Sequence, residues 1–160
     1  MIAVADPVPI YRRGLALVLQ EAGHDVEEWE HPEEKLDGGG DSSTSLEAVV
    51  MTIRSPQDLE VMSKVRAQFE QIAIIALIIR ADVESYRQTL RAGASVAAPW
   101  DATADQVLRR TEAALAGWAV LPSNVVSALA AEEAYAGVLS NDERNWLRRL
   151  NADASNGSND

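Results

Sequence analysis

Short apolar runs alternate with longer amphipathic stretches along most of the chain. Five of these runs have the length and apolar content of strands, and they cover residues 2–5, 25–30, 48–52, 72–79 and 95–98. The run at 72–79 is the most apolar, which is typical of a strand buried on both faces. The run at 25–30 carries four acidic residues, so we expect this strand near an edge of the sheet.

Apolar residues recur every three or four positions after all but the second of these runs, which predicts amphipathic helices. The first helix is predicted to begin around Tyr11 and to bury Tyr11, Gly14, Leu15, Val18, Leu19 and Ala22, with Arg12 on the opposite face. The last, at about 103–117, is predicted to bury Trp118 as well. Residues 32–45 hold at most one helical turn before a Gly/Ser run, so most of this segment is predicted to be a flexible loop.

Repetition of strand and helix predicts an α/β fold, because parallel strands need crossover helices and these crossovers are right-handed. We therefore expect a doubly wound, five-stranded parallel sheet of the flavodoxin-like kind, followed by a C-terminal helical extension. The functional site of such a fold lies at the carboxyl ends of the strands, beside the switch in strand order. This places Asp6, Thr52, Ile78 and Trp100 near one another.

A change of pattern near Val120-Leu121-Pro122 predicts a domain boundary. Residues 1–118 are predicted to form the α/β domain, and the Ala-rich residues 119–138 a helical linker. In residues 139–160, Ser140 and Glu143 form a capping-box pattern that starts an amphipathic helix, and a polar tail follows. We interpret this last segment as the incomplete start of a second domain and a flexible tail.

Charge and composition narrow the possible functions. The formal net charge of -11 argues against binding of nucleic acid or an anionic membrane by this chain, because both surfaces would repel it. With no cysteine, the chain has no disulfide, thiolate metal site or cysteine nucleophile. The apolar run at the amino end is too short for a signal peptide and leads into Asp6. We expect a cytoplasmic protein that does not span a membrane.

Several segments resemble response regulators of the NarL/LuxR type, in which a receiver domain is joined to a helix-turn-helix DNA-binding domain. Residues 2–15 (IAVADPVPIYRRGL) resemble the opening strand, acidic loop and first helix of the family, and residues 91–95 (RAGAS) resemble the run before its fifth strand. Residues 120–122 resemble the exit from the receiver, and residues 139–147 resemble the first helix of the DNA-binding domain. The resemblance covers nearly the whole chain and is weakest at 31–45.

The resemblance also implies where phosphorylation chemistry would take place, and the sequence departs from the family there. The positions concerned are held by Thr52 for the acceptor aspartate, Asp6 and Pro7 for the acidic pair, Ile78 for the hydroxyl, Ala97 for the switch aromatic and Trp100 for the lysine, while Pro56 matches the family. Threonine has no carboxylate to phosphorylate, and Mg²⁺ prefers near-octahedral oxygen ligands including carboxylates. We therefore expect no catalytic residue, metal or cofactor, and a largely apolar cleft.

Individual residues allow more than one interpretation. Thr52 presents a hydroxyl to a ligand or, as we favour, fills space at the strand end. Asp6 holds a cation or caps nearby backbone N–H groups, and capping is favoured. Trp100 closes over a small hydrophobic ligand or plugs the cleft, and the plug is favoured. Asp58 is a substitute acceptor in the loop, which we disfavour.

These observations favour the regulatory receiver domain of a DNA-binding transcriptional response regulator that acts without aspartyl phosphorylation. Control would come from homodimerisation or from a small hydrophobic ligand near Ile78 and Trp100, and DNA would be bound by a further C-terminal domain. One alternative is a receiver that is still phosphorylated or binds Mg²⁺ in an unusual register. Another is a small α/β enzyme or adaptor on the same scaffold, although the chain has no phosphate-cradling glycine loop and no serine elbow.

Overall fold

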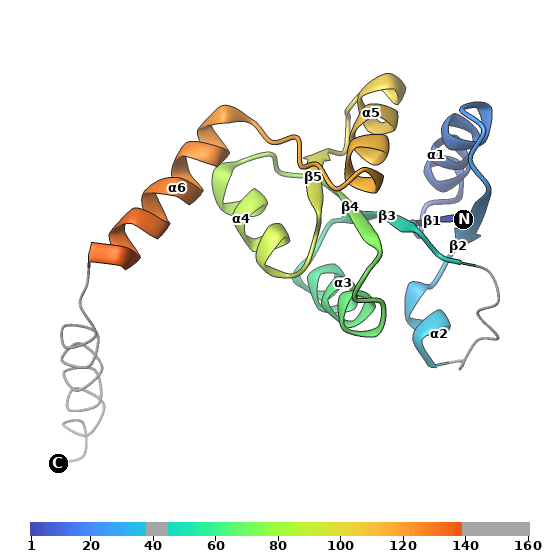
Figure 1. Cartoon of the computed structure of the whole chain (residues 1–160). Helices are drawn as coiled ribbons and strands as arrows, with labels where there is room; N and C mark the ends of the chain where they lie inside the picture. Colours follow the sequence, from blue (N-terminus) through green and yellow to red (C-terminus); the bar gives the residue numbers. More distant parts are fainter. Residues whose placement is uncertain (38–44, 139–160) are drawn as a thin grey trace, which may run out of the picture. The chain divides into compact units, whose positions relative to one another are not determined.

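The computed structural model describes residues 1–37 and 45–138 and divides into two compact units, Met1–Pro122 and Ser123–Asp160. The first unit is built on five strands: β1 (Ile2–Ala5), β2 (Val26–Trp29), β3 (Ala48–Ile53), β4 (Ala73–Ile78) and β5 (Val96–Pro99). All strand pairings are parallel, in the order β2-β1-β3-β4-β5. The prediction of a doubly wound, five-stranded parallel sheet is confirmed, with the acidic second strand at an edge (Figure 1).

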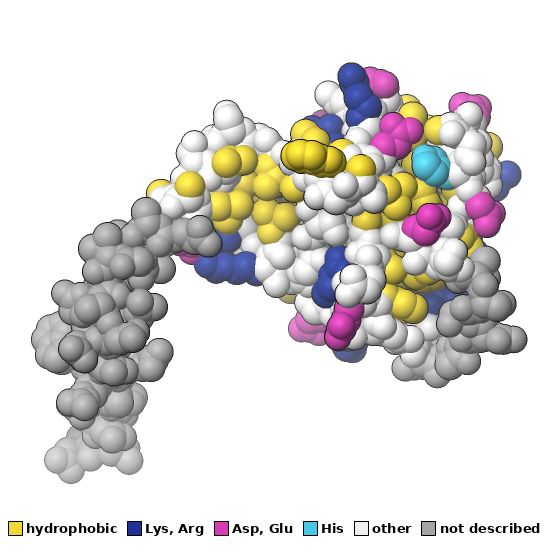
Figure 2. Space-filling model, viewed as in Figure 1, with side chains coloured by type: hydrophobic (Ala, Val, Ile, Leu, Met, Phe, Trp, Pro, Cys, Tyr) yellow, Lys and Arg dark blue, Asp and Glu magenta, His cyan; other side chains and the backbone are white. Residues whose placement is uncertain are grey.

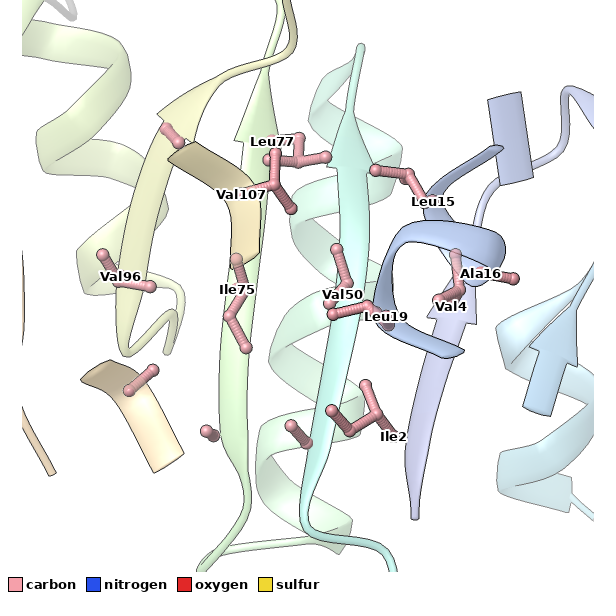
Figure 3. Close-up of a cluster of buried hydrophobic side chains, with 14 residues drawn as sticks. Ile2, Val4, Leu15, Ala16, Leu19, Val50, Ile75, Leu77, Val96 and Val107 are labelled. Atoms are coloured by element: carbon pink, nitrogen blue, oxygen red, sulfur yellow. The ribbon is translucent and has the colours of Figure 1, made fainter. Parts of the chain in front are cut away.

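Helices cover both faces of the sheet. α1 (Pro9–Glu21) and α5 (Ala104–Leu115) lie on one face, while α2 (Pro32–Asp37), α3 (Pro56–Gln68) and α4 (Val83–Arg91) lie on the other (Figure 1). Successive side chains of a strand point to opposite faces. Val50, Ile75 and Leu77 therefore pack under α1 and α5 in the core cluster of Figure 3, whereas Ile78 points toward α3 and α4.

Several details of α1 differ from the prediction. Gly14 and Ala22 are exposed, although they were expected on its buried face. The helix begins at Pro9 rather than near Tyr11, because proline fits the first helical position, where its missing N–H would have no helical partner. Arg12 is buried, although its charge predicted the exposed face. Its Nη1 donates to the carbonyl oxygen of Asp6 at 2.6 Å, and its Nε donates to Glu28 at 3.3 Å, so the buried guanidinium has partners.

Two further predictions need correction. α2 has six residues and is therefore longer than the single turn expected, whereas the Gly/Ser run that follows it lies outside the described residues. Trp118 is 73% exposed and does not join the core face of α5. That helix ends at Leu115, and Gly117 with φ +84° then turns the chain before the helical periodicity reaches Trp118.

Arg66 joins the end of α3 to the turn before β5, at the amino ends of β4 and β5. Its guanidinium donates to the carbonyl oxygens of Phe69, Glu70, Ile72 and Gly93 and to the hydroxyl of Ser95, at 2.8–3.3 Å. Gly93, which follows the C-cap of α4, has φ +113°, a conformation that side-chain-bearing residues rarely adopt. A Cβ atom there would lie 2.7 Å from Cγ of Arg66, so the site requires glycine for space as well.

The surface of the first unit mixes charged side chains of both signs with exposed apolar ones (Figure 2). The large exposed apolar residues of this unit are Val8, Ile10, Leu17, Ile79, Trp100, Leu115, Trp118 and Val120. In the second unit the structure describes one helix, α6 (Ser123–Val138), and the predicted second-domain start at 139–160 lies outside the described residues. None of the helices in the described part of the chain is long and apolar enough to span a membrane.

Candidate functional site

The switch in strand order lies between β1 and β3. β1 is flanked by β2 and β3, so the chain passes β1 on its way from β2 to β3. The helix that follows β1 covers one face of the sheet and the helix that follows β3 covers the other (Figure 1). Asp6 directly follows β1 and Thr52 is the penultimate residue of β3, so both occupy the crevice at this switch, where ligands bind in such folds.

A partly buried ion pair lies in this crevice, beside a cavity of about 200 Å³ that Pro7 and Thr52 line. Asp6 has 0% exposure, and its Oδ1 and Oδ2 accept hydrogen bonds from Nη2 of Arg54 at 3.2 and 2.9 Å. Asp6 Oδ1 also accepts from the backbone N–H of Val8 at 2.7 Å, which confirms its predicted capping role. The Arg54 side chain, two residues beyond Thr52, keeps 31% exposure. The cleft is therefore not the largely apolar one expected, because it contains a guanidinium paired with a carboxylate.

Arg54 was not among the residues singled out from the sequence. It lies 48 positions from Asp6, and nothing in its local pattern distinguishes it from a solvated loop arginine. One signal was available in the sequence: Arg54 directly follows β3, and Asp6 directly follows the neighbouring strand β1. An isolated buried carboxylate needs a partner, and this loop supplies the nearest one.

Thr52 is buried, and its Oγ1 makes no hydrogen bond of normal geometry within the described residues. Its hydroxyl lies near the phenol of Tyr11 and slightly lowers the pKa of that group. The net shift of the Tyr11 pKa is upward, first because the phenol is buried and second because the Asp6 carboxylate disfavours a phenolate. The positive charge of Arg54 opposes this shift. Thr52 is thus a buried strand-end residue beside Tyr11, and it also lines a cavity of about 200 Å³ with Pro7 and Asp58. Its space-filling role stays a prediction.

Trp100 does not plug the cleft, which corrects the favoured interpretation. Its side chain is 43% exposed and packs against Tyr11, with ring centroids 6.1 Å apart and the rings tilted by 56°. The Tyr11 hydroxyl donates to the Trp100 carbonyl oxygen at 2.6 Å. The Trp100 backbone N–H donates to the carbonyl oxygen of Ile78, which fixes the main chain just after β5, and the ring lies beside Tyr11 and partly in solvent.

Ile78 and Ala97 are buried on the side of the sheet that faces α3 and α4. Ile78 lines a cavity of about 280 Å³ between these helices, but Trp100 does not line it. The alternation of strand side chains separates the predicted site residues into two groups. Asp6, Thr52 and Trp100 lie toward α1, whereas Ile78 and Ala97 lie toward α4.

α3 begins at Pro56, four residues after Thr52, with Ser55 as its N-cap. Pro56 occupies its first turn, and Asp58 lies in that turn rather than in the loop where it was expected. Asp58 Oδ2 accepts hydrogen bonds from the backbone N–H groups of Arg54 and Ser55 at 2.8 Å and from the Ser55 hydroxyl at 3.0 Å. Its carboxylate is therefore used in a capping box.

The donor set does not fit magnesium. The resemblance implies carboxylates at three positions, and Asp6 is the one that has a carboxylate, since the others are Pro7 and Thr52. Both Asp6 oxygens already face a guanidinium, which would repel a divalent cation. Within the residues that the structure describes, no cluster of three or more His, Asp or Glu side chains has an arrangement that could hold a metal ion.

No model of a known protein family and no curated protein matches this chain. Solved structures do. A LuxR family DNA-binding response regulator from Silicibacter pomeroyi aligns with a TM-score of 0.65 and 18% identity over 77% of this chain and 97% of its own. RcsB from Salmonella typhimurium aligns with a TM-score of 0.66 and 18% identity over 93% of this chain and 75% of its own. The BeF3-activated receiver domain of DrrB from Thermotoga maritima aligns with a TM-score of 0.60 and 21% identity over 72% of this chain and 96% of its own. The chain therefore has the fold of response-regulator receiver domains.

Proposed function

We propose that this chain is the regulatory receiver domain of a cytoplasmic DNA-binding transcriptional response regulator, and that it acts without aspartyl phosphorylation. The observation that supports this proposal is the ion pair between Arg54 and Asp6 beside Thr52. A receiver that is phosphorylated needs a bound cation and an acceptor carboxylate in this crevice. Here the cation is the protein's own Arg54, and the acceptor position is a threonine.

Charge balance explains why this arrangement is self-contained. A buried carboxylate is costly unless a cation or several hydrogen bonds compensate it. Here the Arg54 guanidinium and the Val8 N–H satisfy Asp6 within the protein. A nucleophilic carboxylate also needs a cation to neutralise the incoming phosphoryl charge. Arg54 is a cation, but at the acceptor position the Thr52 side chain has no carboxylate.

The output of such a domain would be a change in self-association that is passed to a DNA-binding domain. The net charge of -11 makes DNA contact by this chain itself unfavourable, so DNA binding is assigned to residues beyond the receiver. Ile10 and Leu17, seven positions apart, share one side of α1 and remain exposed. Exposed apolar residues on one helix face support a homodimer. An Ile10→Glu variant that remains dimeric by light scattering would exclude this surface.

Treatment with acetyl phosphate and Mg²⁺, followed by intact-protein mass spectrometry, tests the central claim. We expect no species heavier by one phosphoryl group, while a phosphorylatable receiver treated in parallel gains it. Stoichiometric labelling would contradict the proposal. Mapping the labelled residue would then distinguish the alternative of an unusual register, which points to Asp58, from labelling elsewhere. Titration with beryllofluoride and Mg²⁺ provides a second readout, for which we expect no saturable binding.

A further inference from the structure

The cavity beside Ile78 has an unusual combination of lining groups. It has a volume of about 280 Å³ and lies between the carboxyl ends of β3 and β4, the start of α3 and one side of α4. This volume is at the small end of the range for ligand pockets. The cavity faces away from the Tyr11 and Trp100 pair, and Asp6 does not line it. Arg54 does line it and also bonds to Asp6, so the cavity adjoins the crevice that contains Asp6.

The floor of the cavity is apolar. Ile53 and Ile78 are buried there, Leu59 and Pro56 form the wall from α3, and Ile79 is partly exposed at the rim. Binding of an apolar group against these side chains would remove apolar surface from water, at about 25 cal/mol per Å². A strongly hydrated ion such as free phosphate would leave this floor unused.

The charged groups that line the cavity are all basic. Arg54 and Arg80 line it, and no aspartate or glutamate does. This is notable in a chain with 25 acidic and 14 basic residues, in which a random surface site would be more often acidic. Each guanidinium also faces one carboxylate that does not line the cavity, Asp6 or Asp82. Their remaining N–H groups lie above an apolar floor, which complements an anion with an apolar body.

Both guanidiniums keep capacity for a ligand. Arg54 uses Nη2 for Asp6, and within the described residues its Nε and Nη1 make no hydrogen bond. Arg80 is 84% exposed and lies 3.4 Å from Asp82 in a solvent-exposed pair, which is a weak interaction that a ligand can replace. The hydroxyl of Thr89, by contrast, already donates to the carbonyl oxygen of Ser85. The two arginines are therefore the cationic groups available to an anion, and the Ser85 hydroxyl lines the same cavity.

We infer that this cavity binds a small organic carboxylic acid, with the carboxylate between Arg54 and Arg80 and its aliphatic or aromatic body on Ile53 and Ile78. The regulatory meaning of this inference rests on the proposed function. A ligand here joins the loop after β3 to the loop after β4, and its carboxylate contacts the same arginine that compensates Asp6. A metabolite acid would then be the signal in place of a phosphoryl group.

Titration of the full chain with octanoate, followed by backbone amide NMR, tests the inference. We expect saturable binding with shifts at residues of α3 and α4. Octan-1-ol has the same apolar body without the charge and should bind more weakly, and octylammonium should not bind. Raising the salt concentration should weaken octanoate binding, because the guanidinium contacts are partly exposed.

Three variants locate the site. Arg80→Gln should weaken octanoate binding about five- to tenfold by removing one charge-assisted contact. Arg109→Gln is the matched control, because the Arg109 side chain is exposed on α5 and does not line the cavity, and this variant should bind as the wild type. Ser85→Phe fills the cavity from α4 and should abolish binding, with unchanged urea unfolding confirming its fold.

Equal binding of octylammonium, shifts confined to other surfaces, or unaltered affinity in Arg80→Gln would each overturn the inference. These outcomes leave the proposed function standing, since they do not concern phosphorylation. Acetyl phosphate labelling of the wild type would remove the proposed function whatever octanoate does. The two experiments therefore fail independently.

Discussion

Replacing Arg54 with methionine is the most direct test of the ion pair. Arg54→Met keeps most of the apolar stem. It leaves the fully buried Asp6 carboxylate with one remaining hydrogen-bond donor, the backbone N–H of Val8. Removing one partner of a fully buried pair costs about 3–5 kcal/mol. Because the Arg54 side chain is 31% exposed, water reaches the pair, and we expect a loss of about 2–3 kcal/mol in the free energy of unfolding.

A double-mutant cycle with Asp6→Asn isolates the pair itself. The amide oxygen of asparagine can still accept from the Val8 N–H, and the freed guanidinium can turn to solvent, so we expect this variant to lose about 1 kcal/mol. The double variant Asp6→Asn/Arg54→Met buries no charge and should lose less than the sum of the single variants, with a coupling of about 1–2 kcal/mol. Urea unfolding followed by circular dichroism measures all four proteins. In thermal unfolding, Arg54→Met should lower Tm by about 5–10 °C.

Arg80→Met provides the matched control, since it removes an arginine of the neighbouring loop whose pair with Asp82 is exposed to solvent. We expect its stability to equal that of the wild type. If the losses of Asp6→Asn and Arg54→Met add within about 0.5 kcal/mol, the two side chains are not coupled. That result would refute the idea that Arg54 compensates Asp6, and with it the structural argument for a self-contained crevice.

Three further outcomes are expected. Thr52→Asp alone should gain no phosphoryl mass from acetyl phosphate, because the rest of the cation and phosphate-binding set is still absent; a labelled variant would refute this. Tyr11→Phe loses the bond to Trp100 and about 1 kcal/mol at neutral pH. Since the folded protein holds the Tyr11 proton to higher pH than the unfolded chain, this contribution is present below pH 10.0 and declines as the pH rises through the raised pKa. The gap between wild type and variant should therefore narrow in urea titrations above that pH, and a constant gap would count against it. Gly93→Ala should destabilise by about 2–4 kcal/mol through backbone strain and displacement of Arg66, measured in the same way, whereas a neutral effect would disprove the close approach.

The order of strands and helices along the chain could be predicted, because the signals for each element come from neighbouring residues. Short apolar runs and helical periodicity are properties of neighbouring residues, and they predicted the five strands and the helices α1, α3, α4 and α5 to within a few positions. The capping function of Asp6 was also predictable, because an acid directly after a strand can accept from an N–H two residues on. The short α2 was underestimated, since six residues carry too little periodicity.

The arrangement of the candidate site was less accessible to sequence reasoning. Aligning positions with a family placed Thr52, Ile78 and Trp100 in one pocket, but strand pleating directs Ile78 to the opposite face from the other two. Large apolar character suggested that Trp100 is a plug, yet its ring packs on Tyr11 and is partly exposed just after the end of β5.

The sequence by itself thus determined the order of strands and helices along the chain and the absence of a carboxylate at Thr52, because each depends on residue type and near neighbours. Tertiary structure alone decided that Arg54 meets Asp6 and that Arg12 is buried. Both arginines look like surface residues in their local patterns, and each is drawn inward by a polar group that folding buries: the carboxylate and the carbonyl oxygen of Asp6. Compensation of a buried charge by a residue 48 positions away is set by the packing of β1 against β3, which no local pattern contains.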